Sequence, residues 1–314
     1  MCRVRKSSAF IGFGWNNLLE VDKNLKKILL EKMSNFHSSM PVYSIKKLSY
    51  KEMISNSKYY ALQFTGKISD TSFRTSIRKD DLTIVRLSLD TKMRIYHNSN
   101  NILINRKMGL FENLIEKELG REQLSKIVIN EKNRLQLDKF KMSFENVEFE
   151  RLWQIKASSM TIEKTTAPTV TCRIVGGFRR YINEFPVHGG ASIFIKMAGR
   201  RLIQSVGVDW RQIGEKPVNI VRIIAPAIAA ERILKELNSR LRGAVLTMDD
   251  YEPKLFSLGY YSMPKRHQQD YMQPVYVATF ESVTGKTLNA SLVIPASPHT
   301  YEPVTVPLQP MSKV

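Results

Sequence analysis

The sequence predicts an α+β fold in which curved antiparallel sheets carry helices on one face. In residues 173–212, β-branched and aromatic residues alternate with polar ones between breaks at Gly and Pro, which is typical of consecutive strands. In residues 227–241 the apolar residues recur at helical spacing instead. Strand-like alternation also occurs early in the chain, at 82–96. Strands joined by short turns, with few helices between them, favour antiparallel sheets over a parallel α/β arrangement.

Length and composition limit what the chain can be. It has 314 residues, 43% of them hydrophobic, which is enough for one large core or two ordinary ones. Two cysteines, Cys2 and Cys172, do not predict a disulfide framework. The net charge is +19, with 27 basic and 17 acidic residues in 1–150 and 21 and 12 in 151–314. Such an even excess predicts a general affinity for polyanions or anionic membrane surfaces.

Residues 1–40 are predicted to be a basic leader helix and a linker. Three basic residues precede the apolar run 9–15, as in an export signal, but two glycines interrupt the run. Two alternatives follow: a degenerate signal of an exported or envelope protein, or an ordinary cytoplasmic N-terminus. The amphipathic helix predicted at 18–33 either packs on the body of the protein or binds a membrane surface or a partner.

The segment up to residue 160 is predicted to form an N-terminal α+β module, 41–160. Its elements are a strand at 42–45, a helix at 51–65, a hairpin at 82–96, a helix at 110–119 and a strand around 140–155. The polar segment 160–171 then marks either a domain boundary or a loop inside one long sheet.

A C-terminal α+β module is predicted for 161–314, with a proline-rich tail. Its strands at 191–197 and 202–210 form a hairpin around Gly199, so that Ile193 and Ile195 should lie opposite Leu202, Ile203 or Val206. The remaining elements are a helix at 227–241 closed by Gly243, and strands at 244–248, 255–263, 274–281 and 287–294.

The stretch RRYINEFPVHGGASIFIKMAGRRLIQSVGVDWRQI resembles PepSY-type and related propeptide-like modules. The shared features are an aromatic strand, a corner containing Pro-Val and a hairpin ending near a tryptophan, although Glu184 stands where glycine is usual. The segment 259–281 is similar to the closing strands of exported proteins built from such modules. The helix and hairpin at 51–96 then correspond to an earlier, diverged copy. This resemblance implies a non-catalytic binding, regulatory or accessory protein, and it transfers no catalytic residue.

The sequence contains no motif that predicts catalysis, a metal site or a cofactor site. Its five histidines stand far apart, without H-E-x-x-H or C-x-x-C spacing. The glycine pairs at 176–177 and 189–190 lie at strand ends without the following helix that a phosphate loop needs. The acidic cluster Asp249, Asp250 and Glu252 is typical of a solvated turn, and the alternative is a paired-carboxylate acid/base site, as in a hydrolase. We therefore predict no enzymatic activity, no catalytic residue, no metal site, no cofactor and no specific small-molecule ligand.

A protein or peptide is the predicted partner. Pro186 cannot donate a ladder hydrogen bond, so the corner around it should lie at a sheet edge to which an extended peptide adds as a strand. The candidate residues for this contact are Phe185, Pro186, Val187, His188, Tyr260 and Tyr261. The alternative for this corner is that Phe185 and Val187 pack in the core beneath Trp210.

The alternative function is nucleic-acid binding. Arginines beside aromatic residues in the strand-rich half suit a sheet surface that stacks bases and binds phosphates. The candidate residues for anionic ligands are Arg179, Arg180, Arg200, Arg201 and Arg211.

Overall fold

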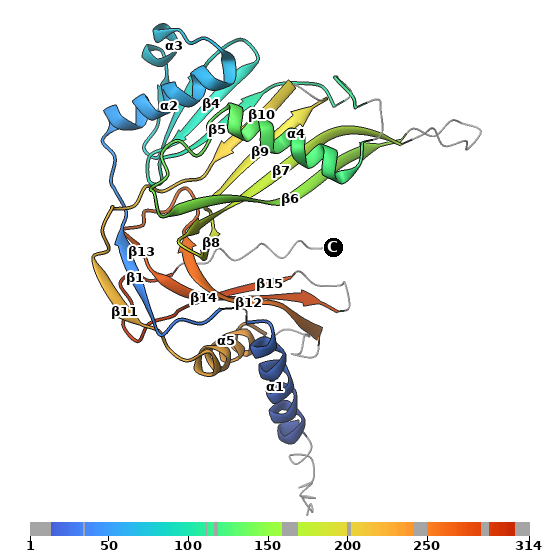
Figure 1. Ribbon diagram of the computed structural model, residues 1–314, viewed down its shortest axis with the longest axis vertical. Coiled ribbons are helices and arrows are strands. Elements are labelled where there is room, and N and C mark those ends of the chain that lie inside the picture. The colour runs from blue at the N-terminus through green and yellow to red at the C-terminus, as the bar shows by residue number, and fades with distance from the viewer. Residues whose placement is uncertain are drawn as a thin grey trace, which may run out of the picture. The chain divides into compact units, whose positions relative to one another are not determined.

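The computed structural model describes residues 14–33, 35–110, 112–115, 119–158, 169–199, 202–241, 250–283 and 289–304. Its helices are α1 (Gly14–Glu31), α2 (Tyr50–Thr65), α3 (Asp70–Arg74), α4 (Arg121–Arg134) and α5 (Pro226–Leu241). The first strands are β1 (Ser39–Ser44), β2 (Ile77–Arg78), β3 (Leu82–Arg86), β4 (Thr91–Tyr96), β5 (Asn101–Arg106), β6 (Glu145–Ala157), β7 (Val170–Ile182) and β8 (Phe185–Gly189). The later strands are β9 (Ser192–Ala198), β10 (Leu202–Val208), β11 (Asn219–Arg222), β12 (Tyr251–Ser262), β13 (Tyr271–Met272), β14 (Pro274–Ser282) and β15 (Ala290–Pro295). The fold is α+β with mostly antiparallel strands, as predicted (Figure 1).

The chain forms two compact units that do not follow the predicted modules. The larger unit contains 42–219 and 260–273, and the smaller contains 1–41, 220–259 and 274–314. The predicted boundary at 160–171 is wrong, because β6 and β7 pair antiparallel from Glu145↔Ile182 to Ala157↔Val170 on either side of it. The alternative, a connection inside one long sheet, is the one the structure has.

In the larger unit the strand order is β8-β7-β9-β10-β5-β4-β3-β2, and β6 lies along the other side of β7. Ile195 lies opposite Val206, as predicted, whereas Ile193 lies opposite Val208. A register shift between Ile203 and Ser205, which the sequence pattern does not reveal, brings Ile195 opposite Val206 and Ile193 opposite Val208.

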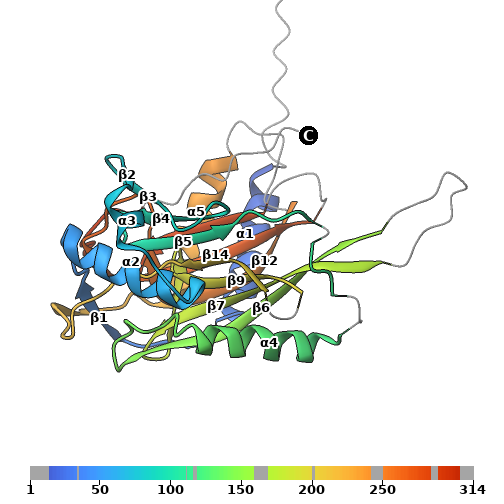
Figure 2. The ribbon, with the colours of Figure 1, turned by 90° about the horizontal axis from the view of Figure 1, so that it is seen from above.

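Helices α2 and α4 lie on the same face of this sheet (Figure 2). Helix α2 packs on β4 and β5, and α4 packs on β6, β7 and β9. The buried side chains of that face and of both helices form a single hydrophobic cluster that includes Val128, Ile174, Phe178, Ile195 and Val206. Because side chains alternate along a strand, the residues between these ones point to the opposite face.

The predicted helix at 110–119 is wrong for the residues that the structure describes. Residues 112–115 are not helical, and Ile115 forms an antiparallel bridge with Thr171. The buried guanidinium of Arg173 donates to the carbonyl oxygens of Leu110 and Glu112 at 2.8 and 3.0 Å, which uses carbonyls that a helix would have bonded internally. The helix forms later instead, as α4.

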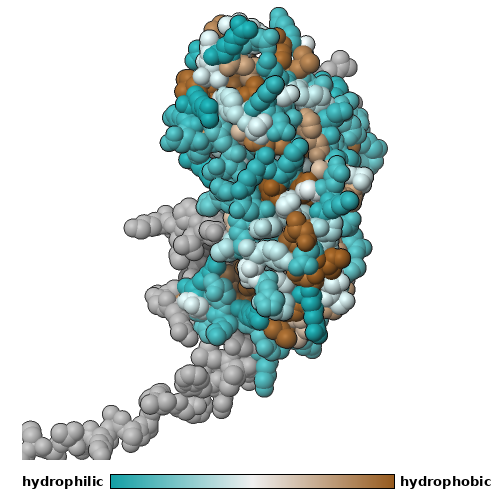
Figure 3. Space-filling model, turned by 90° about the vertical axis from the view of Figure 1, so that its left-hand side faces the viewer, coloured by the Kyte–Doolittle hydropathy of each residue, from teal (hydrophilic) through white to brown (hydrophobic). Residues whose placement is uncertain are grey.

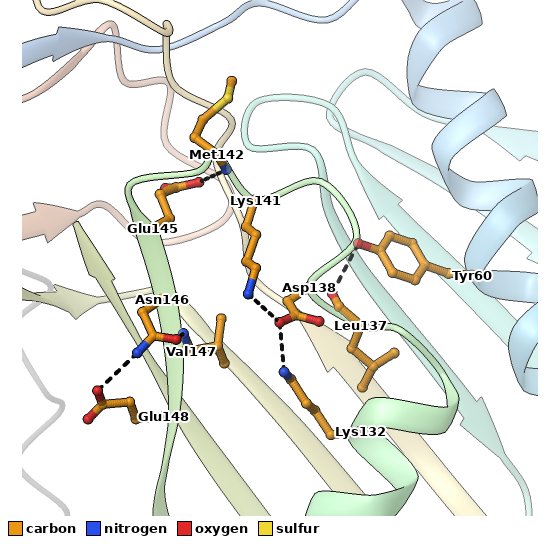
Figure 4. Close-up of polar contacts among 10 residues, drawn as sticks. All are labelled: Tyr60, Lys132, Leu137, Asp138, Lys141, Met142, Glu145, Asn146, Val147 and Glu148. Carbon is orange, nitrogen blue, oxygen red and sulfur yellow. Dashed lines mark hydrogen bonds and ion pairs between the residues drawn. The ribbon is translucent and has the colours of Figure 1, made fainter. Parts of the chain in front are cut away.

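The loop that leads from α4 into β6 is fixed by side chains (Figure 4). Asp138 accepts from Lys132 at 2.7 Å and lies 3.3 Å from the Nζ of Lys141. Tyr60 of α2 donates to the carbonyl of Leu137 at 3.2 Å. This loop therefore ties both helices to the start of β6.

Helix α2 begins as the sequence predicts, within one residue. Ser49 caps it and forms a capping box with Glu52. Inside the helix, the hydroxyl of the buried Ser57 is satisfied by the carbonyl of Met53, to which it donates at 2.7 Å.

The smaller unit packs α5 on β15 and α1 on α5, with β14 between β15 and β12. Leu25 and Leu29 of α1 are buried, and Lys26 pairs with Glu231 of α5. This supports the packing alternative for the leader helix. On α5, Ile233, Leu234 and Leu237 are buried, whereas Ile228 is 46% exposed. Gly243 and the strand predicted at 244–248 lie outside the described residues.

Candidate functional site: the open face of the larger sheet

The corner predicted as a peptide-binding edge is an internal strand. On one side Phe185 and Pro186 of β8 pair with β7, and on the other Val187 and His188 pair in parallel with Tyr260 and Tyr261 of β12. Phe185 and Val187 are 5% and 2% exposed. Strand β8 therefore lies between β7 and β12, and the prediction of a free edge at Val187 and His188 is corrected, because β12 already pairs there.

His188 instead belongs to a small polar cluster with Arg179 and Glu150. Arg179 donates to the His188 Nδ1 at 3.1 Å and pairs with the Glu150 carboxylate. Burial, with the nearby Arg179 charge, lowers the pKa of His188 to about 3. The imidazole is therefore neutral at pH 7, with its proton on Nε2, and it helps to hold Arg179 in place.

Two of the five arginines predicted to bind anionic ligands are buried in the interior of the protein. Arg180 pairs with Glu145, both side chains being fully buried, and its guanidinium lies 4.4 Å from the Trp210 ring. Arg211 donates to the carbonyl oxygens of Met263, Pro264 and His267 at 3.1, 3.0 and 2.7 Å. Neither guanidinium is available to an external anion.

The other three predicted arginines are Arg179, Arg200 and Arg201. Arg179 reaches the sheet surface, with a side chain 19% exposed. Arg200 and Arg201 lie outside the described residues. The prediction is thus wrong for Arg180 and Arg211, whose burial a sequence pattern cannot reveal, and it stays a prediction for Arg179.

The face of the larger sheet opposite α2 and α4 is called here the open face, and two rows of paired residues cross it from β3 to β6. The first row is Arg86, Lys92, Asn105, Ser205, Lys196, Val175 and Trp153. The second row is Ile84, Arg94, Leu103, Gly207, Phe194, Gly177 and Arg151. The rows combine basic, small and aromatic residues.

The β3–β4 end of the open face carries three exposed cations. Arg86 lies directly opposite Lys92, and Arg94 is the next residue on the same face of β4. None of the three side chains has a hydrogen bond or ion pair with any residue that the structure describes. Like charges directly opposite on neighbouring strands destabilise a sheet, and an anion placed against them would offset that repulsion.

Aromatic rings occupy the β6–β9 part of the open face. Trp153 is 49% exposed, and its ring covers Gly177 of the neighbouring strand. The ring of Phe194 covers Gly207 on β10 in the same way. Sequence reasoning missed both residues; the available signal was their alternation with buried Leu152, Ile193 and Ile195 along each strand.

Strand β6 is the edge of this part of the sheet, since no described strand pairs with its outer side. Two register shifts interrupt it, and Glu148, Glu150, Arg151 and Lys156 place charges along it. Bulges and charges are the usual protection against strand addition. The edge therefore gives no support to peptide binding by strand addition.

Other kinds of site have little support among the described residues. No group of three or more His, Cys, Asp or Glu side chains there could hold a metal ion. None of the described helices is both long and apolar enough to cross a membrane. The surface in Figure 3 shows hydrophobic residues in separate patches within a mainly hydrophilic face, so that face does not indicate a broad apolar docking surface.

Comparisons with known proteins add only a distant fold likeness. No family model and no curated protein matches the chain. The crystal structure of an uncharacterized protein from Eubacterium rectale is 12% identical, with a TM-score of 0.49 over 86% of each chain. The resemblance to PepSY-type modules therefore stays a prediction.

Proposed function

We propose that the protein is a non-enzymatic nucleic-acid-binding protein and that the phosphate backbone docks on the open face. The observation that carries the proposal is the cluster Arg86, Lys92 and Arg94, three exposed cations without a counter-ion among the described residues. Phosphates placed against the cluster would relieve the repulsion between Arg86 and Lys92 and gain charge-assisted hydrogen bonds. The net charge of +19 would speed the encounter with a polyanion.

The second candidate, a protein partner, has less support. Its predicted docking strand β8 is paired on both sides, and the outer edge of β6 is interrupted and charged. A strongly acidic protein segment could still meet the same cations, and the experiment includes that outcome.

The test compares two charge reversals of equal size. Lys92→Glu/Arg94→Glu alters the open face, whereas Lys51→Glu/Arg121→Glu alters the first turns of α2 and α4 on the covered side. Acidic residues are well tolerated at helix N-termini, so the control variant should fold normally. Binding of a fluorescein-labelled 20-nucleotide oligothymidylate is followed by anisotropy between 50 and 200 mM KCl.

The open-face variant should lose about tenfold or more in affinity and show a shallower salt dependence, by about 0.7 in log–log slope for each phosphate contact removed. The control should lose much less. Equal losses in both variants would show a net-charge effect only and would end the proposal, as would the absence of binding. Displacement of the oligonucleotide by a polyglutamate peptide at lower concentration than by unlabelled oligothymidylate would assign the face to an acidic protein instead.

A further inference from the structure

Two aromatic rings of the open face lie over glycines, and their placement restricts the form of nucleic acid that can bind. A Cβ on residue 177 would stand 3.0 and 3.2 Å from the Cζ3 and Cη2 atoms of Trp153. A Cβ on residue 207 would overlap the Phe194 ring, with Cδ1 and Cζ at 2.6 and 2.7 Å. Each ring therefore lies across the backbone of a neighbouring strand, in space that only glycine leaves open.

Both rings remain accessible from outside the sheet. Trp153 is half exposed and Phe194 is partly exposed, so an external planar group can reach both rings. Nucleobases stack on such rings whatever their sequence, because every base has a π face.

The spacing of the two rings favours binding of single strands over binding of duplexes. Gly177 and Gly207 lie on β7 and β10, two strand spacings apart across β9, which is about 10 Å. Stacked bases in a duplex are only about 3.4 Å apart, and their faces are covered by their neighbours. Two rings this far apart suit bases that are splayed out, which single strands allow.

We propose that the open face binds single-stranded nucleic acid, with unstacked bases on Trp153 and Phe194 and phosphates on the cations of both rows. This inference rests on the proposed function. The cations lie on both sides of the rings: Arg86, Lys92 and Arg94 at one end, and Arg151, which also pairs with Glu150 at 3.2 Å, beside Gly177 at the other. A strand crossing the face would thus meet positive charge before and after the stacked bases.

The experiment measures the contribution of the bases directly. A 20-nucleotide oligothymidylate, a 20-unit abasic oligonucleotide with the same phosphates and a 20-base-pair duplex are titrated into the full chain at 100 mM KCl. The variants are Trp153→Phe, which keeps a ring, and Trp153→Leu, which covers Gly177 without one. Intrinsic fluorescence provides a second readout: Trp153 is exposed and Trp210 is 6% exposed, and subtracting the spectrum of Trp153→Phe removes the emission of Trp210 and of the third tryptophan, Trp15.

Oligothymidylate should bind wild type about tenfold more tightly than the abasic strand, and it should quench the Trp153 emission. Trp153→Leu should remove most of this difference, whereas Trp153→Phe should keep most of it. Thermal melts that match for the Leu and Phe variants separate loss of stacking from loss of fold.

Equal affinity for oligothymidylate and the abasic strand, or tighter binding of the duplex, would overturn this inference. A base preference that survives in Trp153→Leu would overturn it too. In each of these cases the charge-reversal result could still uphold phosphate binding on the open face. Absence of binding by all three probes would instead remove the proposed function itself.

Discussion

The side chain of Val128 on α4 fills the space directly above Gly176 on β7, so a Cβ at residue 176 would overlap the valine Cγ1. Val128 is fully buried, and a β-branched side chain in a helix has one strongly preferred rotamer, so it cannot move aside. This contact sets how closely α4 approaches the sheet. It also makes two neighbouring glycines very different in their tolerance of a methyl group.

Gly176→Ala should therefore destabilise the protein by about 1–3 kcal/mol, the usual cost of overpacking a core. Gly177→Ala should be nearly neutral, because the Trp153 ring above it is half exposed and can shift by a few tenths of an ångström. Urea unfolding of both variants tests the contrast. The double variant Gly176→Ala/Val128→Ala should be more stable than the two single changes would give by addition; strict additivity would contradict the packing described.

Sequence reasoning succeeded where one local pattern decides the structure. Period-two alternation located β3, β4, β9 and β10, and helical spacing located α2 and α5. It failed at α4 and β5, where polar residues such as Arg121 and Asn105 dilute the pattern and long-range packing decides the outcome. It also placed the corner 185–188 at an edge, since nothing local indicates that β12 returns beside it from about 70 residues later in the chain.

The candidate site was only partly accessible to prediction for the same reason. Alternation in 82–96 already placed Arg86 on the face of Ile84, yet whether Lys92 stands opposite it depends on the hairpin register. The rows that unite β3 with β6 depend on five further pairings, and one of them joins β5 to β10, about 100 residues later in the chain. The presence of an arginine also does not predict which face of the sheet it lies on. Arg179 and Arg180 are adjacent in sequence, yet they point to opposite faces.

The buried pair Arg180–Glu145 should be costly to break and cheap to replace as a whole. Glu145→Gln leaves the Arg180 guanidinium buried beside Trp210 without its carboxylate and should cost about 3–5 kcal/mol. Glu145→Leu/Arg180→Met removes both charges and should cost far less. Unfolding in urea checks both variants. A loss below about 1 kcal/mol for Glu145→Gln would mean that water reaches the arginine.

Acid should destabilise the fold through His188. The pKa of His188 is lowered by burial to about 3, while in the unfolded chain it titrates near 6.5. Between these values the unfolded state binds one more proton, so stability falls as the pH drops from 6.5 towards 3. His188→Gln keeps an acceptor for Arg179 and should lose less stability over this window, by up to about 1.4 kcal/mol per pH unit. Because Glu150 and Arg179 remain in both proteins, identical pH profiles would show that His188 does not titrate as described.

Asp209 should have the opposite pH dependence. Burial raises the pKa of this carboxyl to about 6, and Lys265 and Arg211 offset the effect only in part. The folded state then binds more protons than the unfolded state between pH 3.8 and 6, so the contribution of Asp209 falls as the pH rises through this window. Asp209→Asn removes a carboxylate that is unfavourable at pH 7.5 and should stabilise the protein there by about 1–3 kcal/mol, with little effect at pH 3.5.

Asp138 provides the matched control for this last variant. Although burial opposes it, hydrogen bonding and charge from Lys132, with help from Lys141, lower the pKa of Asp138. Asp138→Asn should therefore reduce stability at pH 7.5 and matter less as the pH falls below the carboxyl's unfolded pKa. Thermal unfolding of both variants at pH 3.5 and 7.5 gives four values whose signs are fixed in advance. If Asp209→Asn and Asp138→Asn both destabilise at pH 7.5, Asp209 makes a favourable ion pair that outweighs its burial.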